Sequence, residues 1–261
     1  MRQSTRRKDN MNNNHRLDLI ISADDFGLVP SVTDGILQGM SNGCITETNL
    51  IATSAYCVEA ATTAKQHHLT HMGIHLNLEI GHSCFDGSAL PNNKLPKGSW
   101  IYYNWVEKEF IAQCECLIRQ GITLSHLTYH KDIITDINMA QIIAKIAKLY
   151  KIPIRRVGNQ KLNAYLTNLQ INMPDIRIAN TGGIDYSFTY LREKLHLVSK
   201  STPKVVEVIC HPGYTSEILS HISSLNVGRL QELKLFTDPK TICMIEEEGY
   251  TLQNYSILGD K

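Results

Sequence analysis

The sequence has almost no net charge and no long apolar segment. Lysine and arginine together number 26 against 25 aspartate and glutamate residues, so the formal net charge is +1. This balance gives no electrostatic reason to expect nucleic acid or an anionic membrane as a partner. No stretch approaches the roughly 18 apolar residues of a membrane-spanning helix. The patterns G-x-S-x-G, G-x-G-x-x-G, the P-loop and H-E-x-x-H are also missing, so the usual signals of serine hydrolases, nucleotide-binding folds and zinc peptidases are absent.

Cysteine occurs seven times, but in no arrangement typical of a zinc knuckle or a disulfide framework. The number is odd, and only Cys114 and Cys116 are close together in the sequence. We interpret all seven as reduced, mostly buried thiols of a cytoplasmic protein.

The N-terminal residues 1–15 contain several basic residues and an asparagine-rich run, without the apolar segment that a signal peptide needs. We predict that this stretch is a disordered tail. The chain has 261 residues, of which 43% are hydrophobic, and this is enough for one α/β domain of barrel size with a large core. We therefore predict a single domain over residues 16–261.

Strand-like and helix-like patterns alternate along this domain. The patterns predict strands over residues 17–21, 46–53, 71–81, 125–130, 154–157, 205–210 and 250–257. They predict helices over residues 32–40, 55–68, 106–120, 137–150, 187–196, 227–236 and 239–248. The first of these helices begins within Ser31–Asp34, a stretch that resembles a capping box. The alternation indicates a parallel sheet wrapped by helices, so we expect a distorted (β/α) barrel, with an open doubly wound sheet as the second choice.

A long segment, residues 81–99, is rich in glycine, proline and asparagine, and we predict that it is a loop. Four aromatic residues follow it closely: Trp100, Tyr102, Tyr103 and Trp105. Aromatic rings can stack on sugars, but we favour the interpretation that they pack together and hold the loop.

Polar side chains stand at the ends of four predicted strands: Asp24 and Asp25, His75, His130 and His211. In α/β folds the carboxyl ends of parallel strands meet at one rim, where active sites lie. A carboxylate and two imidazoles suit Zn²⁺, Mn²⁺, Fe²⁺ or Co²⁺ with open positions for water and substrate. Asp24 would then take a proton from the water and His211 would protonate the leaving amine, which describes metal-assisted hydrolysis of an amide or ester. The plainer alternatives are solvated loop acids and structural histidines.

Four motifs at these positions resemble those of the YdjC-like carbohydrate deacetylases, which include chitooligosaccharide deacetylases. They are SADDFG at residues 22–27, GIHLNL at 73–78, SHLTYH at 125–130 and HPGY at 211–214. The similarity extends from about residue 17 to residue 257 and includes the helical pattern over residues 229–239.

The resemblance implies a polysaccharide-deacetylase-like (β/α) barrel that removes acetyl groups from N-acetylated sugars or oligosaccharides. It implies a divalent metal, Mg²⁺ or Zn²⁺, held by Asp25, His75 and His130. Asp24 is then the catalytic base and His211 the second catalytic residue. The roles of Asp24 and Asp25 are interchangeable at this stage.

The third motif departs from the family pattern. Thr128 stands where family members often have aspartate, and Lys131 and Asp132 follow His130 in place of further histidines. Asp132 is our candidate for the hydrogen-bond acceptor that orients a histidine ligand. The departure keeps two alternatives open: a degenerate member that binds sugar or metal without turnover, and an isomerase or lyase on the same rim. The sequence also leaves open whether the chain forms a homodimer.

Overall fold

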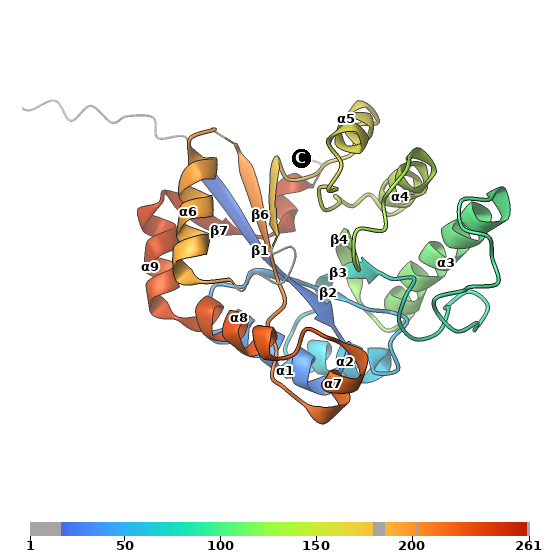
Figure 1. The fold of residues 1–261 in the computed structure, drawn as a ribbon, viewed down its shortest axis with the longest axis horizontal. Coiled ribbons are helices and arrows are strands. Elements are labelled where there is room, and N and C mark those ends of the chain that lie inside the picture. The colour runs from blue at the N-terminus through green and yellow to red at the C-terminus, as the bar shows by residue number, and fades with distance from the viewer. Residues whose placement is uncertain (1–16, 180–185, 202, 260–261) are drawn as a thin grey trace, which may run out of the picture.

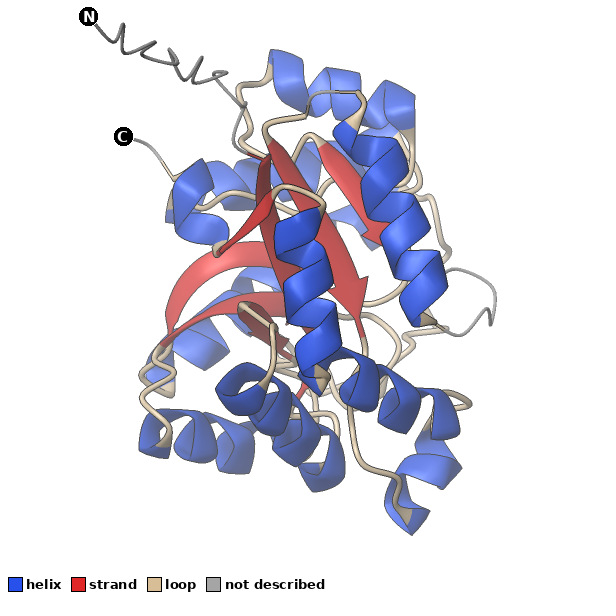
Figure 2. Ribbon diagram, turned by 90° about the vertical axis from the view of Figure 1, so that its left-hand side faces the viewer, coloured by secondary structure: helices blue, strands red, loops and turns tan. Residues whose placement is uncertain are grey.

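The computed structural model describes residues 17–179, 186–201 and 203–259. The predicted tail of residues 1–15 lies outside the described residues. Within them, parallel strands alternate with helices, and the helices surround the sheet (Figures 1 and 2). The strands are β1 Leu17–Phe26, β2 Glu47–Leu50, β3 His71–Leu76, β4 Thr123–Tyr129, β5 Ile176–Ala179, β6 Val205–Cys210 and β7 Tyr250–Gln253. The helices are α1 Pro30–Asn42, α2 Cys57–Gln66, α3 Trp100–Arg119, α4 Ile137–Tyr150, α5 Gln160–Asn168, α6 Phe188–Ser199, α7 Glu217–Ile222, α8 Val227–Thr237 and α9 Pro239–Glu247, with a short 3₁₀ helix, η1, at Tyr255–Leu258.

The central strand of the sheet is β1. The strand order is β4-β3-β2-β1-β6-β5, and β7 also pairs with β1. One edge of β1 is occupied by β6, which pairs with it from Asp18 to Ala23. The other edge of β1 is therefore shared by two strands: β7 pairs with its first residues and β2 with its last. The predicted single, distorted (β/α) barrel is confirmed, since one curved parallel sheet is covered by the intervening helices.

The two faces of the sheet differ in polarity. Leu19, Ile21 and Ala23 of β1 belong to the large apolar core that includes residues of the surrounding helices. The alternate residues face the inside of the barrel, where Ile20 packs with Val205 and Tyr255 and where Ser22 and Asp24 are buried. Buried polar groups in a barrel interior need partners, and these partners build the site described below.

Several predicted elements differ from the structure. The capping box is wrong: α1 begins at Pro30 after Val29, which makes no side-chain cap, and the Ser31 hydroxyl instead donates to Ser216 Oγ (2.9 Å). The predicted strand at residues 154–157 is only a single bridge between Ile154 and Leu127. The predicted last strand ends at Gln253 because the Asn254 side chain accepts a hydrogen bond from Ser256 N–H and starts η1.

The elements that sequence patterns missed are short: β5 has four residues, α5 has nine and α7 has six. The segment with Trp100 and Tyr102 is the first turn of α3 and not an extension of the loop. Residues 81–99 form a loop with one isolated bridge, His82 to Ala89, as predicted. The Trp105 indole donates to Asp86 Oδ2 (2.8 Å), so this aromatic residue does hold the loop.

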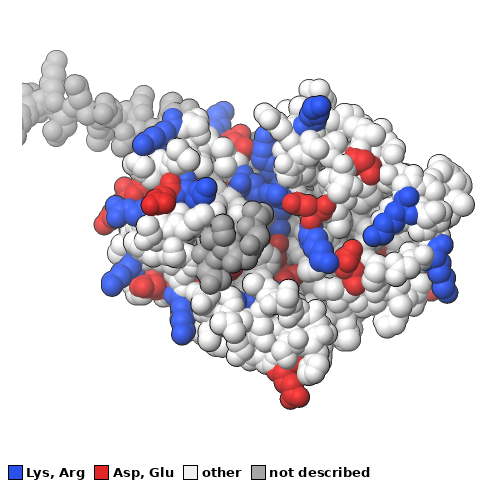
Figure 3. All heavy atoms as spheres, viewed as in Figure 1, with Lys and Arg blue, Asp and Glu red and all other residues white. Residues whose placement is uncertain are grey.

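Charged groups of both signs are interspersed over the face shown in Figure 3, which agrees with the small net charge. Among the described residues, the helices are all too short or too polar to cross a membrane.

Candidate metal centre

The adjacent carboxylates Asp24 and Asp25 reach the same hollow because the end of β1 is irregular. In a regular strand, neighbouring side chains point to opposite faces. Here the register between β1 and β2 shifts between Ala23 and Phe26, and Asp25 has a left-handed backbone with φ of +73°. Such a conformation is uncommon outside glycine, although aspartate tolerates it better than most residues, and it concentrates at functional sites. Both carboxylates therefore line one cavity of about 400 Å³.

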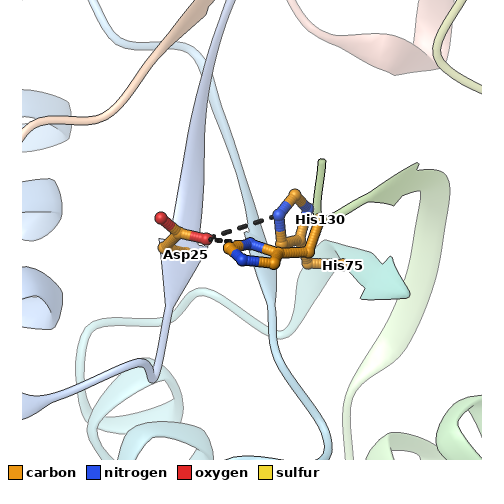
Figure 4. A group of neighbouring side chains, drawn as sticks. All are labelled: Asp25, His75 and His130. Carbon is orange, nitrogen blue, oxygen red and sulfur yellow. Dashed lines mark hydrogen bonds and ion pairs between the residues drawn. The ribbon is translucent and has the colours of Figure 1, made fainter. Parts of the chain in front are cut away.

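Asp25, His75 and His130 converge on one point (Figure 4). Asp25 Oδ1 lies 3.1 Å from His130 Nδ1 and 3.4 Å from His75 Nε2. One ligand atom from each of the three residues lies within 4.8 Å of the other two, and no other such group of acids, histidines or cysteines occurs in the described part of the chain. The three side chains come from β1, β3 and the residue after β4. The strands β3 and β4 are paired, and only β2 separates β3 from β1, so the ends of these parallel strands bring the side chains together.

The hydrogen bonds of His75 orient its ring so that Nε2 faces Asp25. Its Nδ1 lies 2.8 Å from Thr128 Oγ1, and the single hydroxyl proton of Thr128 is donated to the Ile74 carbonyl (3.1 Å). The hydroxyl must therefore accept from His75 Nδ1–H, so Nε2 is the nitrogen left to face Asp25, 3.4 Å from its Oδ1. In the neutral ring, the lone pair of Nε2 would be available to a cation held between this nitrogen and the carboxylate. One carboxylate and two imidazoles form a donor set that fits such a cation.

Thr128 thus occupies the orienting position beside His75, while Asp132 does not orient His130. The Asp132 carboxylate pairs with Arg177 (3.0 Å) at an exposed position. The prediction that Asp132 supplies the acceptor for a histidine ligand is therefore wrong. The Nδ1 atom of His130 lies 3.1 Å from Asp25 Oδ1. Burial alone lowers the pKa of His130, but this hydrogen bond raises it above its usual value.

Two buried arginines neutralise the two carboxylates. Arg155 binds both oxygens of Asp24, at 2.6 and 2.7 Å, and its Nε donates to Glu207 (2.8 Å). Arg229 Nη2 donates to Asp25 Oδ2 (2.6 Å). Burial alone would raise the pKa of each aspartate, but the neighbouring guanidinium holds both below their usual values. Both acids are therefore ionised at neutral pH.

His211 stands at the opening of the cavity. It follows β6, its backbone N–H donates to Glu232 Oε2 (2.5 Å), and its Nε2 lies 3.8 Å from Asp24 Oδ2. Its side chain is 26% exposed, so it is the most solvent-accessible member of the group. All five residues singled out from the sequence line the same cavity.

A second hollow of about 370 Å³ adjoins the first. The two share Glu79 and Lys131, whose side chains form an ion pair (3.2 Å), and Tyr102 and Trp105 line the second hollow. The cavity lined by Asp25, His75 and His130 thus has beside it a second hollow with aromatic residues in its wall.

Sequence reasoning missed the roles of Arg155 and Arg229. Arg155 stood in a predicted strand without a role, and Arg229 only in a helical pattern of the resemblance. The sequence offered one signal: two adjacent buried acids need positive charge near them. This signal does not identify which of the 26 lysine and arginine residues supplies the charge.

Comparisons with known proteins found similar sequences and a similar fold. The model of a family described as YdjC-like protein matches residues 18–247. A protein of Geobacillus stearothermophilus named carbohydrate deacetylase is 29% identical over 242 residues, which is 90% of this chain and 96% of that protein. A protein of the same name from Listeria monocytogenes is 31% identical over 237 residues, covering 85% of this chain and 91% of that one. A solved structure from Enterococcus faecalis, of a protein named for cellobiose-phosphate cleavage, superposes with a TM-score of 0.78 at 24% identity and covers 94% of this chain and all of that one.

Proposed function

The chain belongs to the family of YdjC-like proteins, and on that premise we propose that it is a metal-dependent hydrolase that removes acetyl groups from N-acetylated sugars or oligosaccharides. The observation that carries the proposal is the convergence of Asp25, His75 and His130 in a cavity that Asp24 and His211 also line. Relatives named carbohydrate deacetylase, matched over most of their length, support the choice of substrate.

We assign Asp25, His75 and His130 to the metal and Asp24 to proton transfer. Asp25 Oδ1 faces both imidazoles, whereas Arg155 engages both oxygens of Asp24 and so keeps this carboxylate away from a ligand position. Two imidazoles suit Zn²⁺ better than Mg²⁺, which prefers oxygen ligands. A divalent cation bound there would lower the pKa of its water toward about 7 and polarise the acetyl carbonyl.

Asp24 and His211 provide the acid–base pair of the proposed reaction. Arg155 lowers the pKa of Asp24, which keeps this carboxylate in the deprotonated form that a proton acceptor needs. The lowered pKa also makes Asp24 a weak base, so the proton transfer would depend on a cation that acidifies the attacking water. His211 Nε2 lies 3.8 Å from Asp24 Oδ2 and reaches solvent, so it can hold the proton that the departing amine of the sugar takes. The adjoining hollow with Tyr102 and Trp105 has room for the sugar ring next to the scissile amide.

The test is acetate release from a panel of N-acetylated mono- and oligosaccharides. The protein is stripped with a chelator and reloaded separately with Zn²⁺, Mg²⁺, Mn²⁺ or Co²⁺. We expect acetate release only after reloading, and a loss of at least about 100-fold in kcat/KM for His75→Ala, because a metal ligand is removed. His71→Ala is the matched control, since this exposed histidine lies at the other end of the same strand.

The remaining alternatives predict different results. If the metal-loaded protein releases no acetate from any sugar of the panel, the deacetylase proposal fails. Tight sugar binding without acetate at every metal concentration would instead select a degenerate member that binds without turnover. A changed sugar with neither acetate nor free amine would select an isomerase or lyase.

A further inference from the structure

The side chain of Arg155 crosses the interior of the barrel to reach Asp24. Its backbone lies beside β4, where Arg155 N–H donates to Leu127 O (2.8 Å), whereas Asp24 lies in β1, with β3 and β2 between these two strands. Arg155 is almost completely buried. A long side chain loses conformational entropy when its end is held in one place, so that place has to be defined by strong contacts. The contacts of the guanidinium therefore decide where Asp24 is held.

The guanidinium of Arg155 is shared by two acids on the neighbouring strands β1 and β6. Its Nη1 and Nη2 donate to the two oxygens of Asp24 (2.6 and 2.7 Å), and its Nε donates to Glu207 Oε1 (2.8 Å). Nη2 also donates to Ser22 Oγ (3.2 Å). Each of the three nitrogen atoms therefore has a partner, and groups on two strands fix the orientation of the planar guanidinium.

Glu207 is the firmly anchored partner of this pair. It lies inside β6, which pairs with β1 on one side and with β5 on the other, and its side chain is fully buried. The segment that carries Arg155 is attached to β4 by a single bridge at Ile154. A residue on a strand with two partners moves less than one on a weakly attached segment, so Glu207 is suited to hold Arg155. Neutralising Asp24 does not by itself require Glu207, because one guanidinium already balances one carboxylate.

We propose that Glu207 is a positioning residue: by accepting from Arg155 Nε, it fixes the guanidinium that holds both oxygens of Asp24. The effect of this on catalysis rests on the proposed function, in which Asp24 is the proton acceptor. Without Glu207, Nε would be a buried donor with no acceptor, which costs free energy until the guanidinium turns toward a new partner. Asp24 would turn with it, and a displacement of about 1 Å can cost on the order of 100-fold in rate.

The first test needs neither metal nor substrate, and it follows arginine Nε–H signals of the chelated protein by nuclear magnetic resonance. The Nε–H groups of Arg155 and Arg229 should both be protected from exchange with water, because they are buried and donate to Glu207 and to Leu225 O (3.0 Å). In Glu207→Leu we expect the Arg155 signal to exchange at least about tenfold faster, with the Arg229 signal unchanged as internal control. Arg155→Lys identifies the two signals.

The second test measures acetate release and metal affinity. For Glu207→Leu we expect kcat to fall about 10–100-fold while KM and metal affinity stay close to those of the wild type, because Arg229 and not Arg155 holds the metal ligand Asp25. Glu207→Gln should restore most of kcat, since its amide oxygen can still accept from Nε. Glu47→Leu is the matched control: Glu47 is also buried in the barrel, but its carboxyl accepts from a backbone N–H (3.1 Å).

Three outcomes would overturn the role of Glu207. The first is an Arg155 Nε–H that exchanges freely in the wild type, a measurement that does not depend on any variant being folded. The second is an equal loss of kcat in Glu207→Leu and Glu47→Leu, which would indicate a general disturbance of the barrel. The third is a Glu207→Gln variant as slow as Glu207→Leu, since the charge and not the hydrogen bond would then matter. A wild type that releases no acetate would contradict the proposed function instead, and the exchange measurement would still decide whether Glu207 fixes Arg155.

Discussion

At the scale of single residues, the repulsion between the two neighbouring carboxylates is offset because each forms an ion pair with a different arginine. Asp24 pairs with Arg155 and Asp25 with Arg229, and all four side chains are almost completely buried. Burying charges costs free energy that pairing only partly returns, so such pairs do not in themselves stabilise a fold. Their effect here is that two buried carboxylates stay ionised in the cavity, where the proposed reaction needs a cation ligand and a proton acceptor.

Thr128→Val tests the orienting hydroxyl. Valine has nearly the shape of threonine but cannot accept from His75 Nδ1–H, so the ring loses its fixed tautomer. We expect metal affinity to fall about 10–100-fold, measured by competition with a chromophoric chelator, with little change in the fold. Thr123→Val, at the exposed start of the same strand, is the control. Equal affinities for Thr128→Val and the wild type would contradict the role given to this hydroxyl.

Glu47 predicts a pH dependence of stability. Its carboxyl is buried in the barrel, and burial raises its pKa to about 7, above the ordinary 4.5. The folded state therefore binds more protons than the unfolded state between these values, so the free energy of unfolding falls as pH rises from about 4.5 to 7. At about 1.4 kcal/mol for each pKa unit, the loss is on the order of 3 kcal/mol.

Glu47→Gln removes this titration. In urea unfolding of metal-free protein, we expect the variant to gain stability relative to the wild type as pH is raised from 5 to 8. Glu59→Gln, exposed on α2, controls for the loss of one charge. Curves of Glu47→Gln and the wild type that stay parallel over this range would contradict the prediction.

At the scale of elements, the site depends on irregular strand ends and on close packing between a helix and a turn. The shifted register at the end of β1 turns two acids inward, and the loop after β6 delivers His211. That loop lies against α1: Tyr214 N–H donates to Ser31 O (3.0 Å), and a Cβ at Gly35 would come within 2.5 Å of Gly213 Cα. Gly35 is thus required for the closest approach between α1 and the segment carrying His211.

Gly35→Ala is expected to force α1 and the loop apart. Because the obstructing atoms are backbone, relief requires a shift of the loop, at a cost of about 1–3 kcal/mol in unfolding free energy and with a marked loss of kcat as His211 moves. Gly39→Ala in the same helix meets the end of the flexible Ile45 side chain instead, so we expect it to retain activity. Comparable activity in both variants would contradict this account.

At the scale of the whole molecule, one cation would join strands from three parts of the chain. Its ligands come from β1, from β3 and from the residue after β4, so binding should stabilise the entire barrel. A ligand at 100 times its Kd contributes about 2.7 kcal/mol to folding stability. We expect saturating Zn²⁺ to raise Tm by roughly 5–10 °C over chelated protein, measured by calorimetry.

His130→Ala should abolish that shift while leaving the Tm of the chelated protein within a few degrees of the wild type, because His130 is partly exposed. A wild-type Tm that does not respond to any divalent cation would argue against a metal in this cavity. The cytoplasmic location and the homodimer stay predictions of the sequence.

The alternation of strands and helices, the complete span of α4 behind its Asp136 cap and the complete span of β6 were all predictable, because each depends on local periodicity and capping. So was the gathering of the Asp24–Asp25 pair, His75, His130 and His211 at one place, since parallel strands end at one rim, whereas the choice of Asp25, His75 and His130 as a set came from the family resemblance. The arginines that pair with the two aspartates were not predictable. Arg155 lies 131 residues from Asp24 and Arg229 lies 204 residues from Asp25, and no local pattern connects residues so far apart.

By itself, then, the sequence determined which strands would carry the reactive groups to the rim, because hydrophobic periodicity decides where a strand runs and where it ends. Only the tertiary structure decided that both aspartates turn inward, which arginine neutralises each, and that Thr128 rather than Asp132 orients a histidine. These choices depend on a left-handed residue at a strand end and on contacts across the barrel. This backbone conformation and these contacts form only when segments far apart in the sequence pack together in the folded protein.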